Sequence, residues 1–142
     1  FLRFNFPPAR LFMGDSGSIP LGFMAATLGI AGAMNGVWPW LFPLLVFSPF
    51  IVDASVTLAR RALRGEKIWQ AHRSHYYQRA VLLGATHRQL ALAAYALMLL
   101  AAVLAFALLL LPQYSAGLLI LSASMYLLIF LAIEQRWRTR AV

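Results

Sequence analysis

Long apolar stretches dominate the chain. The clearest one covers 90–111 and contains no charged residue, no glycine and no proline. About 20 apolar residues in a helix cross the roughly 30 Å of hydrocarbon in a bilayer. Three further apolar stretches cover 19–34, 37–59 and 117–133. This pattern predicts an all-α fold: a polytopic integral membrane helix bundle with four transmembrane helices in a single membrane domain, 1–142.

The first two predicted spans differ in character. Small residues recur at helical spacing along the first, which ends in an Asn35-Gly36 turn, and such a face lets another helix approach closely. The second contains Pro39, Pro43 and Pro49, so we expect it to be kinked or broken.

The basic residues test this number of spans. All twelve Lys and Arg lie before the first span, in the loop 60–89, or after the fourth span. Four spans place them all on one side, which the positive-inside rule identifies as cytoplasmic, together with both chain ends. The net charge of +8 is therefore explained by topology, and no nucleic-acid partner is expected, because nucleic-acid binding needs a continuous water-facing basic surface.

The loop between the second and third spans has signals of local structure. Gly65 marks a helix stop, and 75–83 reads as a short helix ended by Gly84. Thr86 and Gln89 have the spacing of a capping box that begins the third span.

Asp15 precedes the first span, between Gly14 and Gly17. Glycines permit sharp turns, and the helix N-terminus that follows favours a phosphate. A carboxylate there could hold Mg²⁺, which usually takes one or two carboxylates plus substrate phosphates. The alternative is that Asp15, Ser16 or Ser18 is only an N-cap.

Of the other acidic residues, Asp53 has both a functional and a structural interpretation. Asp53 follows Pro49 inside the second span, and an ionisable residue within a span is a functional hypothesis by default. Its alternative is a structural partner for an arginine or for a backbone group freed by the kink. Glu66 and Glu134 are expected to be solvated or paired with nearby arginines.

Polar side chains are concentrated in 72–79 of the loop. Arginines bind phosphate bidentately, His75 could donate to a diphosphate, and Tyr76 or Tyr77 could stack on a base. The alternative is a headgroup-facing loop that only fixes topology.

Several motifs together resemble a known family. They are NFPPARLFMGDSGS at 5–18, LGF at 21–23, PFIVD at 49–53, and Arg-Arg-x-x-x-Gly from Arg60 to Gly65, followed by the His75 loop. They look like the signature of the polyprenyl-phosphate N-acetylhexosamine-1-phosphate transferases, of the glycosyltransferase family 4 type. The superfamily includes phospho-N-acetylmuramoyl-pentapeptide transferase.

The resemblance implies an enzyme of the bacterial inner membrane with a cytoplasmic active face. It would move N-acetylhexosamine-1-phosphate from a UDP-sugar to undecaprenyl phosphate, release UMP, and so initiate O-antigen or other surface polysaccharide synthesis. Its implied cofactor is Mg²⁺, with Mn²⁺ as a substitute. Its implied partners are UDP-N-acetylhexosamine, undecaprenyl phosphate and membrane lipid, and a homodimer is left open as the assembly.

The resemblance also implies roles for particular residues. Asp15 and His75 would be catalytic, and Asp15 would also be the metal ligand. The substrate-binding residues would be Asn5, Gly14, Ser16, Asp53, Arg60, Arg61, Arg73, Tyr77 and Gln78. Tyr77 and Gln78 replace histidines of the commoner motif, and His72 replaces an aspartate, which favours a surface-polysaccharide branch over the muramoyl-pentapeptide substrate.

Two expectations concern what the chain lacks. The family has a paired-aspartate motif, whereas this chain has no adjacent acidic pair and begins with Phe1. We therefore expect the C-terminal part of a longer transferase, inactive alone. A different class remains open: a non-catalytic membrane subunit or transporter segment whose basic loops bind anionic lipid.

Overall fold

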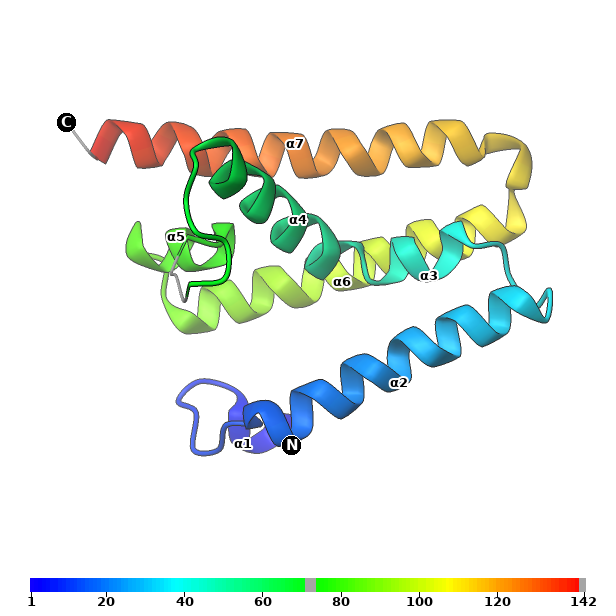
Figure 1. Cartoon of the computed structure of the whole chain (residues 1–142), viewed down its shortest axis with the longest axis horizontal. Coiled ribbons are helices and arrows are strands. Elements are labelled where there is room, and N and C mark those ends of the chain that lie inside the picture. Colours follow the sequence, from blue (N-terminus) through cyan, green and yellow to red (C-terminus); the bar gives the residue numbers. More distant parts are fainter. Residues whose placement is uncertain (71–73, 141–142) are drawn as a thin grey trace.

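The computed structural model describes residues 1–70 and 74–140, and within them all regular secondary structure is helical. The elements are α1 (Leu2–Asn5), α2 (Gly14–Met34), α3 (Leu41–Val46), α4 (Ser48–Leu63), α5 (Tyr76–Leu82), α6 (His87–Leu110), the 3₁₀ turn η1 (Pro112–Tyr114) and α7 (Ser115–Arg140). Figure 1 shows their arrangement. The all-α prediction is confirmed for the described residues.

Three helices of the described residues are long and apolar enough to cross a membrane: α2, α6 and the η1–α7 segment 112–139. The expected second span is not one helix. It divides at Phe47 into α3 and α4, and Pro49 lies in the first turn of α4. A proline lacks the N–H that would continue the α3 ladder, which explains the expected break.

The predicted turn signals are confirmed. Gly36, Gly65 and Gly84 all have positive φ, at 70°, 68° and 104°, just after the ends of α2, α4 and α5. Such a backbone conformation is open mainly to glycine. At the start of α6, the backbone N–H of Gln89 donates to Thr86 Oγ1 at 3.2 Å, and the N–H of Thr86 donates to Gln89 Oε1 at 2.9 Å. This is the capping box expected from the sequence.

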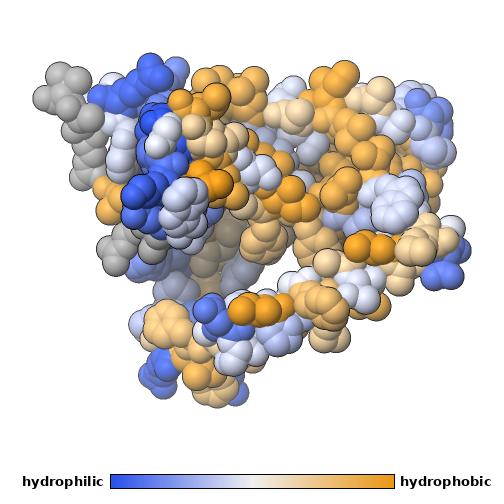
Figure 2. Space-filling model, viewed as in Figure 1, coloured by the Kyte–Doolittle hydropathy of each residue, from blue (hydrophilic) through white to orange (hydrophobic). Residues whose placement is uncertain are grey.

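The helices α3, α4, α5 and α7 pack around α6, as Figure 1 shows. The core is small and consists of Leu45, Ala105 and Leu108, with partly buried apolar side chains from α3 and α7 against it. Large apolar side chains elsewhere on α6 and α7 are exposed, including Leu99, Phe106 and Leu128 at 58% or more. Figure 2 shows this apolar exterior along the bundle and hydrophilic residues gathered where α4 and α5 meet. Such a surface is stable in lipid but not in water.

Helix α2 buries only Gly29 and Gly32. The indole of Trp38 lies directly where a Cβ of Gly32 would be, and its Nε1–H donates to the Gly29 carbonyl at 3.0 Å. Pro43 of α3 contacts Gly29. The predicted small-residue face therefore receives the chain that follows it, while Gly22 on the same helix faces open space.

Candidate functional site

Asp53 joins α4 to the start of α5. Its Oδ1 accepts a hydrogen bond from the backbone N–H of Tyr76 at 2.9 Å, and its Oδ2 lies 3.1 Å from Nδ1 of His75. The Asp53 side chain is only 17% exposed and that of His75 25%, so the contact is largely shielded from solvent. The carboxylate accepts a hydrogen bond from Nδ1 of His75 in the tautomer that carries its proton on that nitrogen. Two of the predicted site residues are thus brought together from separate elements.

The helical start of α5 fixes the position of His75 in a second way. The backbone N–H of His75 donates to Oε1 of Gln78 at 3.3 Å, which is half of a capping box. Gln78, predicted to bind substrate, is placed where its side chain supports the helix that carries His75.

Glu134 of α7 is the centre of a group of arginines from three helices. Arg60 of α4 donates to both of its carboxylate oxygens, at 2.6 and 3.2 Å. Arg79 of α5 donates to Oε2 at 3.1 Å, and Arg138 donates to Oε1 at 3.4 Å. The expectation that Glu134 pairs with arginines is confirmed. These contacts hold α4, α5 and α7 together at the polar end of the bundle.

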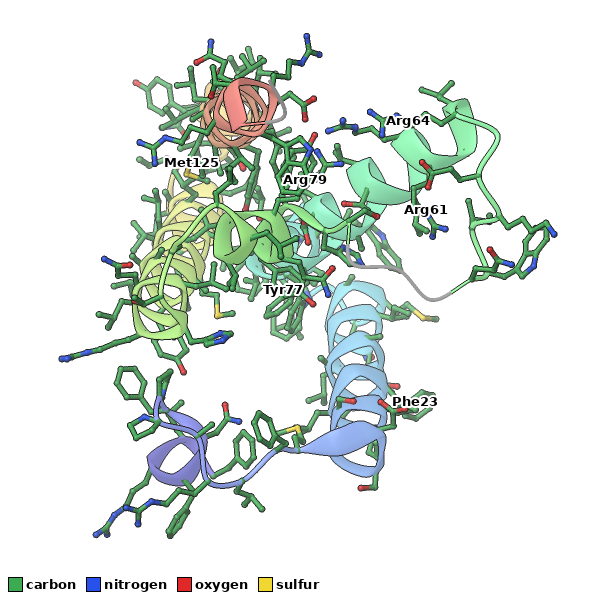
Figure 3. All side chains as sticks on the ribbon, turned by 90° about the vertical axis from the view of Figure 1, so that its left-hand side faces the viewer. Phe23, Arg61, Arg64, Tyr77, Arg79 and Met125 are labelled. Carbon is green, nitrogen blue, oxygen red and sulfur yellow. The ribbon has the colours of Figure 1, made fainter. Side chains whose placement is uncertain are left out.

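Tyr76 lies inside this cluster. Its ring stacks on Phe130 with centroids 4.2 Å apart, its hydroxyl accepts a hydrogen bond from Arg60, and the guanidinium carbons of Arg60 and Arg79 each lie 5.5 Å from its centroid. Tyr76 is 6% exposed and is therefore unavailable for stacking on a ligand. Tyr77 is 51% exposed, and Figure 3 shows it on the side of α5 away from α7.

Arg61 organises the loop that follows α4. It donates to Glu66 Oε2 at 2.9 Å and to the carbonyls of Lys67 and Ile68 at 2.7 and 3.3 Å. The side chain of Arg61 is 8% exposed, so its donors are directed into the protein. The expected pairing of Glu66 with an arginine is confirmed. Arg61, which was predicted to bind substrate, instead uses its donors to hold the loop after α4.

Asp15 lies in the first turn of α2, which begins five residues earlier than the predicted span. The N-cap of α2 is Met13, without a side-chain cap, so Asp15, Ser16 and Ser18 do not cap this helix. Gly14, the residue before Asp15, has a φ of 62°. Asp15 and Ser16 are exposed, and Asp15 makes no ion pair with any residue in the described ranges.

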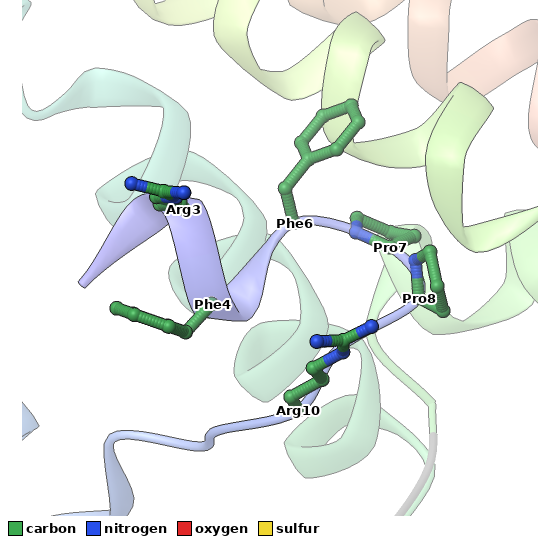
Figure 4. A pocket seen from close by; sticks show the side chains of 6 residues that line it. All are labelled: Arg3, Phe4, Phe6, Pro7, Pro8 and Arg10. Atoms are coloured by element: carbon green, nitrogen blue, oxygen red, sulfur yellow. The ribbon is translucent and has the colours of Figure 1, made fainter.

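A side-chain hydrogen bond of Asn5 joins the two ends of the loop before α2. Asn5 Nδ2 donates to the carbonyl of Leu11 at 2.9 Å. A cavity of about 340 Å³ lies beside it, shown in Figure 4, and is lined by Arg3, Phe4, Phe6, Pro7, Pro8 and Arg10. Asn5 therefore shapes this loop and is not itself part of the cavity wall.

The candidate site has two parts, Asp15 in the first turn of α2 and the Asp53–His75 pair at the start of α5. The beginning of α2 and α5 lie toward the same end of the molecule (Figure 1). No group of three His, Asp or Glu residues gathers there among residues 1–70 and 74–140. Asp15 is a single carboxylate that makes no ion pair with any described residue, which fits an ion held mainly by substrate phosphates. Arg73 and His72 lie outside the described residues.

The sequence interpretation expected Glu134 to pair with arginines but did not predict that Arg60 and Arg79 share it. It also did not predict that the Arg79 guanidinium carbon lies 5.1 Å from the centre of the Trp137 ring. The available signal was Glu134 itself, an acidic residue at the basic end of the last span.

Comparison with known proteins shows the family of the chain. Residues 1–33 match the profile of Glycosyl transferase family 4. The chain is 33% identical over 97 residues to the probable undecaprenyl-phosphate N-acetylglucosaminyl 1-phosphate transferase of Bacillus subtilis, an alignment covering 67% of this chain and 27% of that protein. The chain belongs to glycosyl transferase family 4.

Other curated relatives have related names. A decaprenyl-phosphate N-acetylglucosaminephosphotransferase of Mycobacterium tuberculosis is 32% identical over 109 residues, again covering 67% of this chain and 27% of that protein. A phospho-N-acetylmuramoyl-pentapeptide-transferase of Rhodopseudomonas palustris is 35% identical over 77 residues, covering 54% and 21%. No solved structure matches the chain. The chain thus spans about a quarter of the length of its curated relatives.

Proposed function

We propose that this family 4 chain forms part of a membrane transferase that moves N-acetylhexosamine-1-phosphate from a UDP-sugar to undecaprenyl phosphate. A phosphate oxygen of the lipid forms a bond to the β-phosphorus of the nucleotide-sugar. The bond from that phosphorus to the UMP oxygen breaks, and UMP leaves with the electron pair. The observation that carries the proposal is the Asp53–His75 contact at the basic end of the bundle, in a chain whose relatives are named for sugar-phosphate transfer to polyprenyl phosphates.

The four-span topology belongs to the same proposal. The α3–α4 pair serves as the second crossing, broken at Phe47. In Figure 1 this pair runs back from the α2–α3 turn toward the end that carries α5, so the four passes alternate in direction. The turns at 35–40 and 111–114 contain no Lys or Arg, whereas the opposite end is basic, which supports a cytoplasmic location for that end and for both chain termini.

We assign Asp15 the role of Mg²⁺ ligand and catalytic residue. Its free carboxylate would hold an ion that neutralises phosphate charge during transfer. Gly14 and Ser16 place backbone and hydroxyl groups beside the same helix start, where the helix dipole favours phosphate. Mn²⁺ would serve in place of Mg²⁺ because the same oxygen ligands suit both ions.

His75 would donate to the diphosphate, with Asp53 holding its ring in place. Tyr77 is the exposed aromatic residue beside it, at 5.6 Å between ring centroids, and is positioned to stack on the base of the nucleotide. Arg60 and Arg73 would add positive charge. Phosphoryl transfer needs mainly such positioning and charge neutralisation rather than covalent catalysis.

The assay that tests the proposal measures UMP release from a panel of UDP-N-acetylhexosamines by membranes containing the complete protein. Release should need a divalent cation and added undecaprenyl phosphate, and the sugar that supports it identifies the donor. UMP release that is unchanged when undecaprenyl phosphate is left out would contradict transfer to the lipid. A surface-polysaccharide role predicts that loss of the protein removes the lipid-linked first sugar of such a polymer.

A further inference from the structure

A small cavity lies where α4, α5 and the loop between them meet, and of the residues that line it only Arg60 has a part in the proposed transfer reaction. It is lined by Thr57, Arg60, Arg61, Arg64, Glu66, Ser74 and Arg79. Figure 3 labels three of these arginines at the α4–α5 junction. Its volume is about 20 Å³, enough for one oxygen-sized group, since a single water needs about 10–15 Å³. Neither Asp53 nor His75 lines it.

Two residues that line this cavity each have a buried polar atom without a partner in the described part of the chain. Among the described residues, Thr57 Oγ1 and Arg79 Nε are the buried side-chain polar atoms without a hydrogen bond. Thr57 is 2% exposed and Arg79 is 7% exposed. Buried polar groups are nearly always satisfied, so their cavity is expected to contain an acceptor. Both groups can donate a hydrogen bond to an acceptor in the cavity.

The charge around the cavity favours an anion over water. The arginines at this junction are Arg60, Arg61, Arg64, Arg79 and Arg138, whereas Glu66 and Glu134 are the carboxylates that pair with them in the described residues. Together with the Asp53 carboxylate, which joins α4 to the start of α5, three carboxylates face five guanidinium groups and leave two positive charges in excess. Burial and the neighbouring Arg60 charge lower the pKa of the Arg79 guanidinium, which shows that this charge is poorly solvated. A neutral water molecule would not offset this excess of positive charge, whereas an anion would.

We propose that this cavity binds one oxygen of a phosphate monoester, with the Thr57 hydroxyl and Arg79 Nε–H as its donors. Arg64, which has no carboxylate partner among the described residues, faces the remaining phosphate oxygens. Arginine suits this role because its planar fork matches phosphate geometry. The phosphate is either that of a membrane lipid or that of a soluble molecule such as a nucleotide. None of these three residues has a role in the proposed transfer reaction.

The test is a titration of inorganic phosphate into the complete protein in phosphatidylcholine nanodiscs, followed by calorimetry. The fluorescence of Trp137, whose ring contacts Arg79, gives a second readout through a Trp137→Phe comparison. Thr57→Val keeps the shape and removes the donor, and Arg79→Lys keeps the charge and removes Nε. Arg88→Gln, at the exposed start of α6, is the control for a change in charge at a residue that does not line the cavity.

Saturable binding by the wild type and Arg88→Gln, weakened about tenfold or more in Thr57→Val and Arg79→Lys, is the expected result. Thr57→Val removes an unpaired hydroxyl and should fold, so the test remains decisive even if Arg79→Lys does not. Absence of saturable binding in the wild type, or an unchanged Kd in Thr57→Val, would overturn the proposal in favour of a water-filled cavity.

Two further arms identify the source of the phosphate. Nanodiscs doped with phosphatidic acid should suppress inorganic phosphate binding if the site serves a lipid headgroup. Competition by UMP in undoped nanodiscs should be seen if it serves a nucleotide. Suppression by phosphatidic acid and competition by UMP each support a phosphate site if the effect is lost in Thr57→Val. No nucleotide-sugar is present in these titrations, so their result is independent of the transferase assay.

Discussion

The carboxylate of Asp53 and the imidazole of His75 lie 3.1 Å apart, although 22 positions separate them in the chain. The same carboxylate accepts the backbone N–H of Tyr76, so it holds both the ring and the main chain at the start of α5. Under the proposed function Asp53 acts through His75, as a positioning residue for the group that meets the substrate.

Asp53→Asn should therefore reduce kcat of the complete enzyme by about 10- to 100-fold with a smaller effect on KM, because the amide can still accept from Tyr76 but no longer fixes the charged contact to His75. UMP release measures both constants. Ser55→Ala, on the exposed face of α4, is the matched control.

A double-mutant cycle checks the coupling between the two residues. If Asp53 acts through His75, then Asp53→Asn should cost little once His75→Asn is present, since residues that act as a unit are not additive. Independent, multiplicative losses would show that Asp53 is not the positioning residue for His75.

Removing the carboxylate of Glu134 should destabilise the junction of α4, α5 and α7. Glu134→Gln leaves the Arg60 and Arg79 guanidinium groups without an anionic partner, at an expected cost of about 2–4 kcal/mol in the free energy of unfolding. Denaturant unfolding in detergent, followed by tryptophan fluorescence, measures it. Glu66→Gln is the matched control, because Glu66 is 42% exposed and its pair should contribute about 1 kcal/mol or less. Equal losses in the two variants would contradict the central place of Glu134.

The fit of Trp38 against α2 predicts opposite effects for two glycines of one helix. Gly32→Ala places a Cβ where the indole lies and should cost about 1–3 kcal/mol, with a change in Trp38 emission. Gly22→Ala meets nothing within 4 Å and should be neutral or stabilising by up to about 1 kcal/mol. Similar stability of the two variants would show that Trp38 does not pack on Gly32 in the membrane.

The features that the sequence predicted correctly depend on residues that are close together in the chain. Gly65 and Gly84 end helices because their backbone conformations suit glycine, and Thr86 with Gln89 closes a capping box within four residues. The break in the second span was also predictable, because a proline interrupts the hydrogen bonds of the helical turn in which it lies. These features need no knowledge of tertiary packing.

The candidate site was only partly predictable, because its contacts are long-range. The polar pattern alone left Tyr76 and Tyr77 open as stacking residues, and the structure shows that Tyr76 is buried against Phe130. It likewise left Asp53 open between a functional group and a backbone partner, whereas the structure has it contacting both an imidazole and a main-chain N–H. The cavity at Thr57 left no trace in the sequence pattern.

The proposed four crossings can be tested by labelling, because the chain has no cysteine and any introduced thiol is unique in this segment. Asn35→Cys and Gln113→Cys should react with an impermeant maleimide from one side of the membrane, and Lys67→Cys from the other. Reaction of Asn35→Cys and Lys67→Cys from the same side would show that the α3–α4 pair does not cross.

The measurement that bears most directly on the proposed function is Mg²⁺-dependent UMP release by the complete protein with Asp15→Asn. Asp15 is exposed at the start of α2 and has no internal partner in the described residues, so the amide should leave folding and insertion unchanged. Ser18→Ala, in the next turn of α2, is the control. We predict that Asp15→Asn abolishes release while Ser18→Ala retains it. Normal release by well-inserted Asp15→Asn would contradict the assignment of Asp15 and of the metal that it would hold.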